Sequence, residues 1–153
     1  MNCRLYILGV LIAMLSFTSC KDNYYIENDL HGMWQVTSIE KLSTGEFFSP
    51  QGTLYYLFQR SMVSLCYSYL NMPERLDEFI AHFDLMGSDS IGMGDFRYST
   101  SGEGDKVNRE TKVPIDSLNR FGIYQDYTKF HLQQSKKKMV LTSDSACIVF
   151  RRY

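Results

Sequence analysis

The sequence predicts an all-β protein, an eight-stranded antiparallel up-and-down barrel with one short helix before its sixth strand. Short runs rich in Tyr, Phe, Leu and Val recur along the chain, and turn-like segments separate most of them. Nearly every run can pair with the next through a local turn, and closing such a meander into a barrel leaves no open edge. A two-sheet sandwich is the alternative, because periodicity alone does not separate the two.

The first residues have the layout of an export signal. Arg4 precedes an apolar run, Leu5 to Phe17, which small polar residues follow. The run has about 13 residues, short of the roughly 20 that a transmembrane helix needs. Thr18-Ser19-Cys20 behind this run resembles the lipobox of bacterial lipoproteins. The resemblance implies that residues 1–19 are a signal peptide and that Cys20 becomes a lipid-bearing (palmitate-modified) first residue.

A lipid on Cys20 implies a location in the cell envelope of a Gram-negative bacterium, and we expect the outer membrane. The alternative is an ordinary signal with a coincidental cysteine. Residues 20–29 are polar and without periodicity, so they are predicted to be a tether, and residues 30–153 are predicted to form the barrel domain.

Charge and cysteine content narrow the class of protein. Removal of Arg4 with the signal leaves 15 basic against 17 acidic residues, a balance that gives no reason to expect nucleic acid as a partner. The envelope would permit a disulfide between Cys66 and Cys147. Both lie in strand-like runs that are not neighbours in the predicted order, so we expect two buried thiols.

Three strand-like runs open the domain. Met33 to Leu42 alternates around Trp34, and Leu54 to Gln59 and Met62 to Leu70 are dense in aromatic and branched side chains. Only Gln59 to Ser61 connects the last two, which predicts a tight hairpin.

The fourth run, Phe79 to Leu85, fits two patterns. Alternate positions are apolar, with His82 and Asp84 on the other face, as in a strand. The spacing from Leu76 onward also fits the 3.6-residue period of a helix. We choose a strand, preceded by one helical turn after Pro73.

The second half continues the meander. Ser90 to Phe96 is a weaker strand, and Arg97 to Lys112 is a long polar segment that we expect to be exposed. Pro114 to Gly122 is predicted to be a short helix, because proline near the start and glycine at the end are typical helix boundaries. Lys136 to Lys138 is predicted to be a solvated hairpin turn. The last three strands are Tyr127 to Gln134, Met139 to Ser143, and Cys147 to Tyr153.

Both ends of the domain resemble a known family. Leu30-His31-Gly32-Met33-Trp34 resembles the start of a lipocalin-type barrel, and Ile148 to Tyr153 resembles its final strand. With the lipobox, the chain is similar to the small lipocalin-like lipoproteins of Bacteroidetes over most of residues 30–153. The resemblance implies that Trp34 plugs the closed end and that Arg151 or Arg152 stacks on its ring.

The connections predict one closed and one open end. Those after the even strands are all short, and three of the four after the odd strands are long. The tether and the last residues belong to the closed end, so the mouth is expected to point away from the membrane. The predicted helix would flank that mouth as a lid.

An inward Trp34 sets the parity of the interior positions. Eight strands enclose either a filled core or one small ligand, and the many rings favour filling. If hollow, the interior would suit a small apolar molecule. The candidate ligand-contacting residues are Tyr56, Phe58, Ser64, Phe83, Phe130, Met139 and Phe150. The same parity places Val36, Ser38, Cys66, Leu132, Leu141 and Ile148 inside.

No motif indicates catalysis, a metal or a cofactor. His31, His82 and His131 lack the paired spacing of zinc sites. No Gly-x-Ser-x-Gly elbow occurs, and Gly92-Met93-Gly94 lacks the third glycine of a dinucleotide motif. We therefore predict a protein that is not an enzyme.

Two functions remain open. The first is a membrane-anchored lipocalin-like lipoprotein that binds a small apolar molecule in the cell envelope. The second is a non-catalytic interaction module whose open-end loops contact another envelope protein or a glycan. The second predicts a filled barrel and an exposed apolar patch near Phe47, Phe48 or Tyr98.

Overall fold

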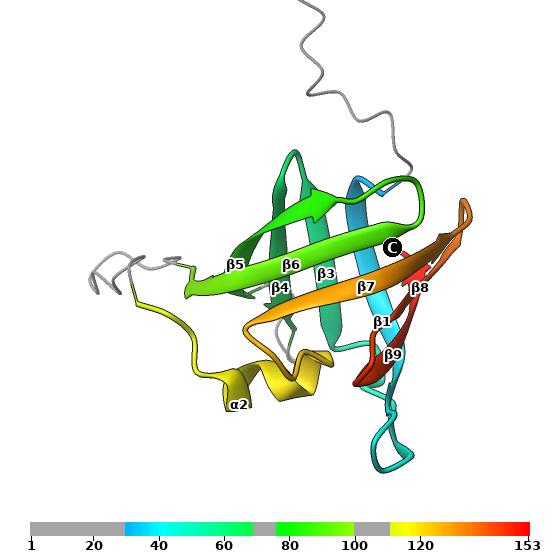
Figure 1. The fold of residues 1–153 in the computed structure, drawn as a ribbon, viewed down its shortest axis with the longest axis horizontal. Helices are drawn as coiled ribbons and strands as arrows, with labels where there is room; N and C mark the ends of the chain where they lie inside the picture. Colours follow the sequence, from blue (N-terminus) through cyan, green and yellow to red (C-terminus); the bar gives the residue numbers. More distant parts are fainter. Residues whose placement is uncertain (1–29, 69–75, 100–110) are drawn as a thin grey trace, which may run out of the picture.

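The computed structural model describes residues 30–68, 76–99 and 111–153. Its strands form one antiparallel sheet that closes on itself, because β9 pairs with β1 (Figure 1). The ring has eight strands, and β2 pairs only with the end of β1, beyond the point where β3 leaves it. The predicted eight-stranded antiparallel barrel with one short helix is confirmed, and the sandwich is excluded.

The predicted strands are all present, and β2 is an addition that the sequence analysis missed. The described strands are β1 (Gly32–Lys41), β2 (Glu46–Phe48), β3 (Leu54–Gln59), β4 (Met62–Tyr67), β5 (Leu76–Leu85), β6 (Ser90–Tyr98), β7 (Tyr127–Gln134), β8 (Lys138–Thr142) and β9 (Ala146–Arg152). The segment with the helix–strand ambiguity is a strand. The helical turn expected after Pro73 and most of the polar segment after Arg97 fall outside the described residues.

A bulge in β1 corrects the predicted position of Ser38. Val36 pairs with Phe150 and Ser38 pairs with Val149, so Thr37 is an extra residue on β1. An extra residue reverses the alternation of faces beyond it. Ile39 is therefore buried in the core, and Ser38, predicted inside, lies half-buried on the outer face.

The register of the β3–β4 hairpin corrects Ser64 and Cys66. Its turn consists of Arg60 and Ser61, so Phe58 lies directly opposite Val63. Directly paired residues share a face of the sheet, which turns the next residue, Ser64, outward. Cys66 is also on the outer face, buried in a small cluster with Tyr55 and Leu57.

Residues 113–123, before β7, close one end of the barrel with α2 (Ile115–Leu118) and the 3-10 helix η1 (Asn119–Phe121) (Figure 1). The side chains of Leu118, Phe121 and Ile123 are buried in the core. Gly122 permits the close approach, since it has φ +82° and a β-carbon there would lie 2.8 Å from a side-chain carbon of Ile148. The segment therefore plugs the mouth, where the sequence analysis expected a lid beside it.

We refer to this end, with α2, η1, β2 and the β8–β9 turn, as the helix end. The opposite end, with the turns at residues 60–61, 86–89 and 135–137, is the Trp34 end. The chain enters the barrel at the Trp34 end and finishes there, because the backbone nitrogen of Tyr153 donates to the carbonyl of Met33.

One buried hydrogen bond ties the plug to the barrel wall. The Tyr56 hydroxyl donates to the carbonyl oxygen of Phe121 at 2.6 Å. We predict that Tyr56→Phe lowers the free energy of unfolding by about 1–3 kcal/mol, because it leaves a buried carbonyl without its donor. Urea denaturation followed by tryptophan fluorescence measures this. Tyr153→Phe, at a ring that is 74% exposed, is the control and should change stability by less than about 0.5 kcal/mol. An equal effect of the two substitutions would contradict the prediction.

Candidate functional site

The barrel interior holds six of the seven candidate ligand-contacting residues, all except Ser64. Their exposed fractions lie between 0% and 3%. A cavity that admits water would expose the side chains that line it, so values this low mean that these side chains fill the space between them. The six are Tyr56, Phe58, Phe83, Phe130, Met139 and Phe150.

Aromatic rings account for much of this filling. Tyr56 and Phe150 meet edge to face with 4.9 Å between ring centroids, and Phe58 and Phe83 do so at 5.3 Å. Phe121, from the plug, meets Phe79 in the same way at 5.8 Å. Such pairs add about 0.5–1.5 kcal/mol each beyond the burial of their area. The rings of wall and plug therefore form one continuous core.

The Trp34 end is closed by a pair that the family resemblance implied. Trp34 is fully buried, and the Arg152 guanidinium lies 5.0 Å from the centroid of its ring. Arg152 also donates to the carbonyl of His31 at 2.7 Å. The stacking residue is Arg152, because Arg151 instead donates to the side-chain oxygen of Gln35.

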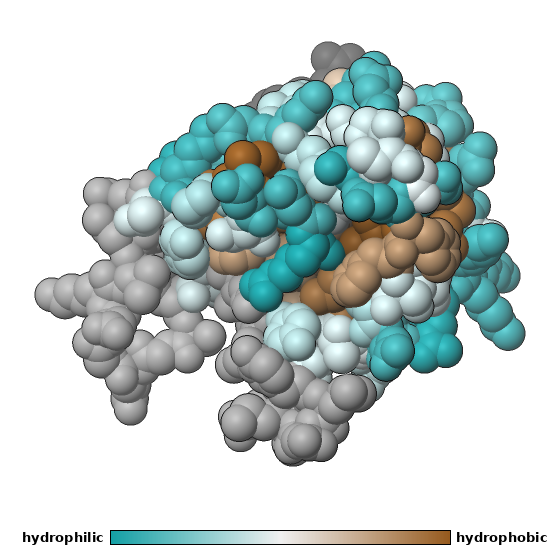
Figure 2. Space-filling view, turned by 90° about the horizontal axis from the view of Figure 1, so that it is seen from below, coloured by the Kyte–Doolittle hydropathy of each residue, from teal (hydrophilic) through white to brown (hydrophobic). Residues whose placement is uncertain are grey.

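A groove lies open at the helix end, and we refer to it as the rim groove. Its volume is about 320 Å³, close to the lower limit of small-molecule sites. It runs between the β1–β2 hairpin and η1, and Figure 2, which looks onto this end, shows apolar surface beside hydrophilic side chains. The lining residues are Ile39, Lys41, Glu46, Phe47, Phe48, Asn119, Arg120 and Tyr124.

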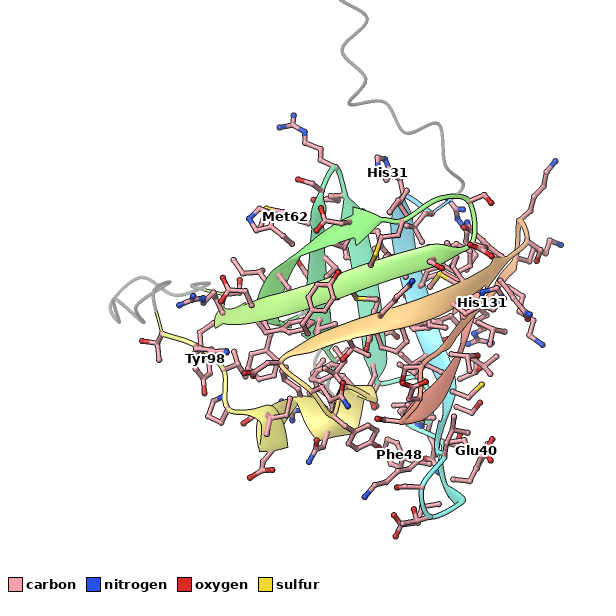
Figure 3. The ribbon with its side chains drawn as sticks, in the orientation of Figure 1. His31, Glu40, Phe48, Met62, Tyr98 and His131 are labelled. Carbon is pink, nitrogen blue, oxygen red and sulfur yellow. The ribbon has the colours of Figure 1, made fainter. Side chains whose placement is uncertain are left out.

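Two exposed rings dominate the rim groove. Phe47 is 69% exposed and Phe48 51%. Phe48 lies beside Glu40 at the helix end, and His31 lies at the opposite end (Figure 3). Tyr98, the third residue of the predicted patch, is half-buried and packs edge to face on Phe79 at 5.5 Å. The exposed patch is therefore confined to the β2 hairpin.

Cations stacked on rings line the rest of the groove. The Lys41 ammonium lies 5.5 Å above the ring of Tyr124, and the Arg120 guanidinium lies 5.2 Å from the Phe121 ring. Partial burial, and then the nearby charge of Glu46, raises the pKa of the Tyr124 hydroxyl. The Tyr124 hydroxyl is neutral at physiological pH and lies on the wall of the groove that Asn119 and Arg120 also line.

The sequence pattern indicated only one side of this groove. Phe47 and Phe48 stood out as adjacent aromatics in a turn-rich segment. The bulge in β1 hid the inward position of Ile39 from the sequence pattern. Arg120 and Tyr124 lie more than 70 residues beyond Phe48 in the sequence. No local pattern marks residues that only the plug brings together.

The described residues hold no metal-binding cluster. Within residues 30–68, 76–99 and 111–153, no three His, Cys, Asp or Glu side chains lie where a metal ion could bind. No disulfide joins Cys66 and Cys147; Cys66 is buried as expected, and Cys147, which was expected to be buried, is half-buried. No helix in the described ranges is long and apolar enough to cross a bilayer.

A closed eight-stranded antiparallel barrel with one end covered by a stacked Trp–Arg pair is the architecture of a lipocalin-like protein. The chain belongs to the lipocalin-like domain family, whose model matches residues 14–153. None of the curated proteins matches the sequence.

Two solved structures share the fold. A lipocalin-like protein from Bacteroides uniformis is 18% identical with a TM-score of 0.55, covering 82% of this chain and 100% of its own. An uncharacterized protein from Bacteroides eggerthii is 21% identical with a TM-score of 0.58, covering 80% of this chain and 98% of its own.

Burial of Tyr56 predicts a loss of stability at alkaline pH. Burial, and then Tyr124, raises the pKa of its hydroxyl far above the ordinary value of 10.0. The unfolded chain ionises Tyr56 near pH 10 and the folded chain does not, so its contribution is complete below that pH and declines above it. For one such group, the free energy of unfolding falls by about 1.4 kcal/mol for each pH unit above that point. Urea denaturation of the wild type and of Tyr56→Phe should show that the difference between their free energies of unfolding narrows above about pH 10. A constant gap would show that Tyr56 ionises equally in both states.

Proposed function

We propose that this chain is a lipid-anchored envelope protein that binds a small apolar molecule at the rim groove, outside the filled barrel. The observation that carries the proposal is the contrast in exposure between the aromatic rings of the barrel interior and those of the rim groove. The interior rings have almost no exposed surface, and the rings of Phe47 and Phe48 are exposed to solvent beside a groove. Binding of a small hydrophobic molecule is consistent with the lipocalin-like family.

The hydrophobic effect supports the rim as the binding place. Binding inside the barrel would require several fully buried rings or the whole plug to move, which would break the Tyr56–Phe121 hydrogen bond. Binding at the rim covers rings that are already exposed, at about 25 cal/mol per Å² of apolar surface removed from water. No rearrangement of the described core is needed.

The anchor rests on the sequence alone. The apolar run before Thr18-Ser19-Cys20 supports export and lipidation. Each buried CH₂ of an acyl chain adds about 0.8 kcal/mol, and stable attachment takes more than one chain.

We predict that Cys20→Ser prevents both lipidation and release of the signal peptide. Radiolabelled palmitate should enter the wild type and not the variant, and the variant should migrate as the longer precursor on gels. Cys66→Ser is the matched control and should be labelled as the wild type is. Equal labelling of the wild type and Cys20→Ser would overturn the anchor.

Identification of the molecules that co-purify with the protein tests the rim groove as a binding site. The protein is purified gently from native membranes, its organic extract is analysed by mass spectrometry, and the affinity of the identified molecule is measured by titration. We predict that Phe47→Ser with Phe48→Ser weakens binding at least about tenfold, since each ring contributes up to about 1.5–3 kcal/mol when buried. The control is Phe83→Leu with Phe130→Leu, which should lower stability and leave binding unchanged. Binding that is lost only in the interior variant would place the ligand inside the barrel.

A second candidate function uses the same surface. The hairpin of β2 presents two exposed phenylalanines on a three-residue strand that pairs, among the described strands, with β1 alone. Exposed aromatic rings are enriched at protein interfaces. If the extract holds no small molecule and the Phe47/Phe48 variant loses a co-purifying envelope protein, the chain is an interaction module.

A further inference from the structure

The Trp34 end carries a cluster of exposed cations, which we refer to as the basic cluster. Its residues come from the β3–β4 turn, the β7–β8 hairpin and the end of β9, and all are exposed. They are Arg60, Lys136, Lys137, Lys138, Arg151 and Arg152.

Strand pairing makes the cluster continuous. Lys138 pairs with Arg151 across β8 and β9, and the backbone of Arg152 donates to the carbonyl of Lys137 at 2.9 Å. Arg152 reaches the start of β1, and β1 pairs with β3 two residues before Arg60. The cations therefore span four neighbouring strands, β8, β9, β1 and β3, at one end of the barrel.

This clustering does not follow from composition, because the whole chain has more acidic than basic residues. The described turns of the Trp34 end contribute one acidic side chain, Asp89, which lies 3.8 Å from His131. The helix end carries five exposed carboxylates: Glu40, Glu46, Asp116, Asp126 and Asp144. Three cations, Lys41, Lys112 and Arg120, offset part of this charge and leave the helix end net negative. At the Trp34 end the six cations outnumber the carboxylates Asp84 and Asp89, so the two ends differ in the sign of their net charge.

The polarity of charge coincides with the position of the predicted anchor. The chain enters the barrel at Leu30, at the Trp34 end, and ten residues join it to Cys20. Ten residues extend at most about 36 Å, so the lipid holds this end near the bilayer. Attraction between exposed cations and anionic lipid falls off within about 10 Å, a distance that such a tether allows the barrel to close.

We propose that the basic cluster is a membrane-facing surface that binds anionic lipid head groups. This proposal rests on the proposed lipid anchor for the location of the protein in the cell, but binding to the head groups requires only the barrel. Contact at the Trp34 end turns the helix end, with its carboxylates and the rim groove, away from the membrane. The cluster thus sets the direction in which the groove faces.

Vesicle sedimentation tests the surface without the lipid anchor. The protein is residues 20–153 with Cys20→Ser, a chain that contains every strand of the closed barrel. It should bind vesicles of phosphatidylcholine with phosphatidylglycerol and not vesicles of phosphatidylcholine alone, and high salt should release it. Equal binding to both vesicle types would overturn the proposal.

Two triple variants separate the basic cluster from overall charge. Lys136→Gln, Lys137→Gln and Lys138→Gln together should weaken binding to the anionic vesicles about 100-fold, at about fivefold for each lysine. The matched control removes the same charge away from the Trp34 end. It combines Arg97→Gln, Lys112→Gln and Lys129→Gln, and none of these residues lines the rim groove.

The control should bind within about threefold of the parent chain, because attraction to the vesicle falls off within about 10 Å and none of its three residues lies in the turns or strand ends of the Trp34 end. Unchanged urea midpoints show that both variants are folded. Equal losses of vesicle binding in the two triple variants would contradict the proposal that the basic cluster is the membrane-binding surface. Failure of palmitate labelling at Cys20, by contrast, would overturn the anchor and leave the vesicle result standing.

Discussion

Pairing between β1 and β9 closes the sheet, and closure sets a fixed interior volume that eight strands must fill. Trp34, Tyr56, Phe58 and Phe150 occupy that volume with almost no residual exposure. Neither end can then stay open, because water at the mouth would reach these rings. The Arg152–Trp34 stack covers one end and the plug carrying Phe121 covers the other. The rest of the molecule is arranged around a core that excludes water.

With a filled core, the binding that we propose falls on the surface of the barrel. The same plug that seals the barrel supplies Asn119, Arg120 and Tyr124 to one wall of the rim groove. The opposite wall exists because β1 runs past the end of β3 and turns back as β2, which leaves Phe47 and Phe48 without cover. Sealing the interior and creating an external apolar site are thus two results of one arrangement.

The two ends of the barrel have different chemistry, and both differences would serve the lipid-anchored protein that we propose. The Trp34 end is basic and is where the described chain enters the barrel, and the helix end is acidic at its margins and has an apolar groove. Lipid attachment at Cys20 and contact through the lysine turn would hold the barrel at two points. Two contacts define an orientation, which a single flexible tether does not.

The sequence by itself determined the eight strands of the closed ring, their order and the Trp34 end, but not β2. Alternation in a segment such as Phe79 to Leu85 is a local property of a chain with one face buried, and short turns impose antiparallel neighbours. Only the tertiary structure decided the faces of Ser38 and Ser64, the role of the plug and the rim groove. A one-residue bulge or turn shift reverses which side chains face inward without changing the local pattern. The groove joins Phe48 to Tyr124, residues that meet because the closed barrel brings the β2 hairpin against the plug.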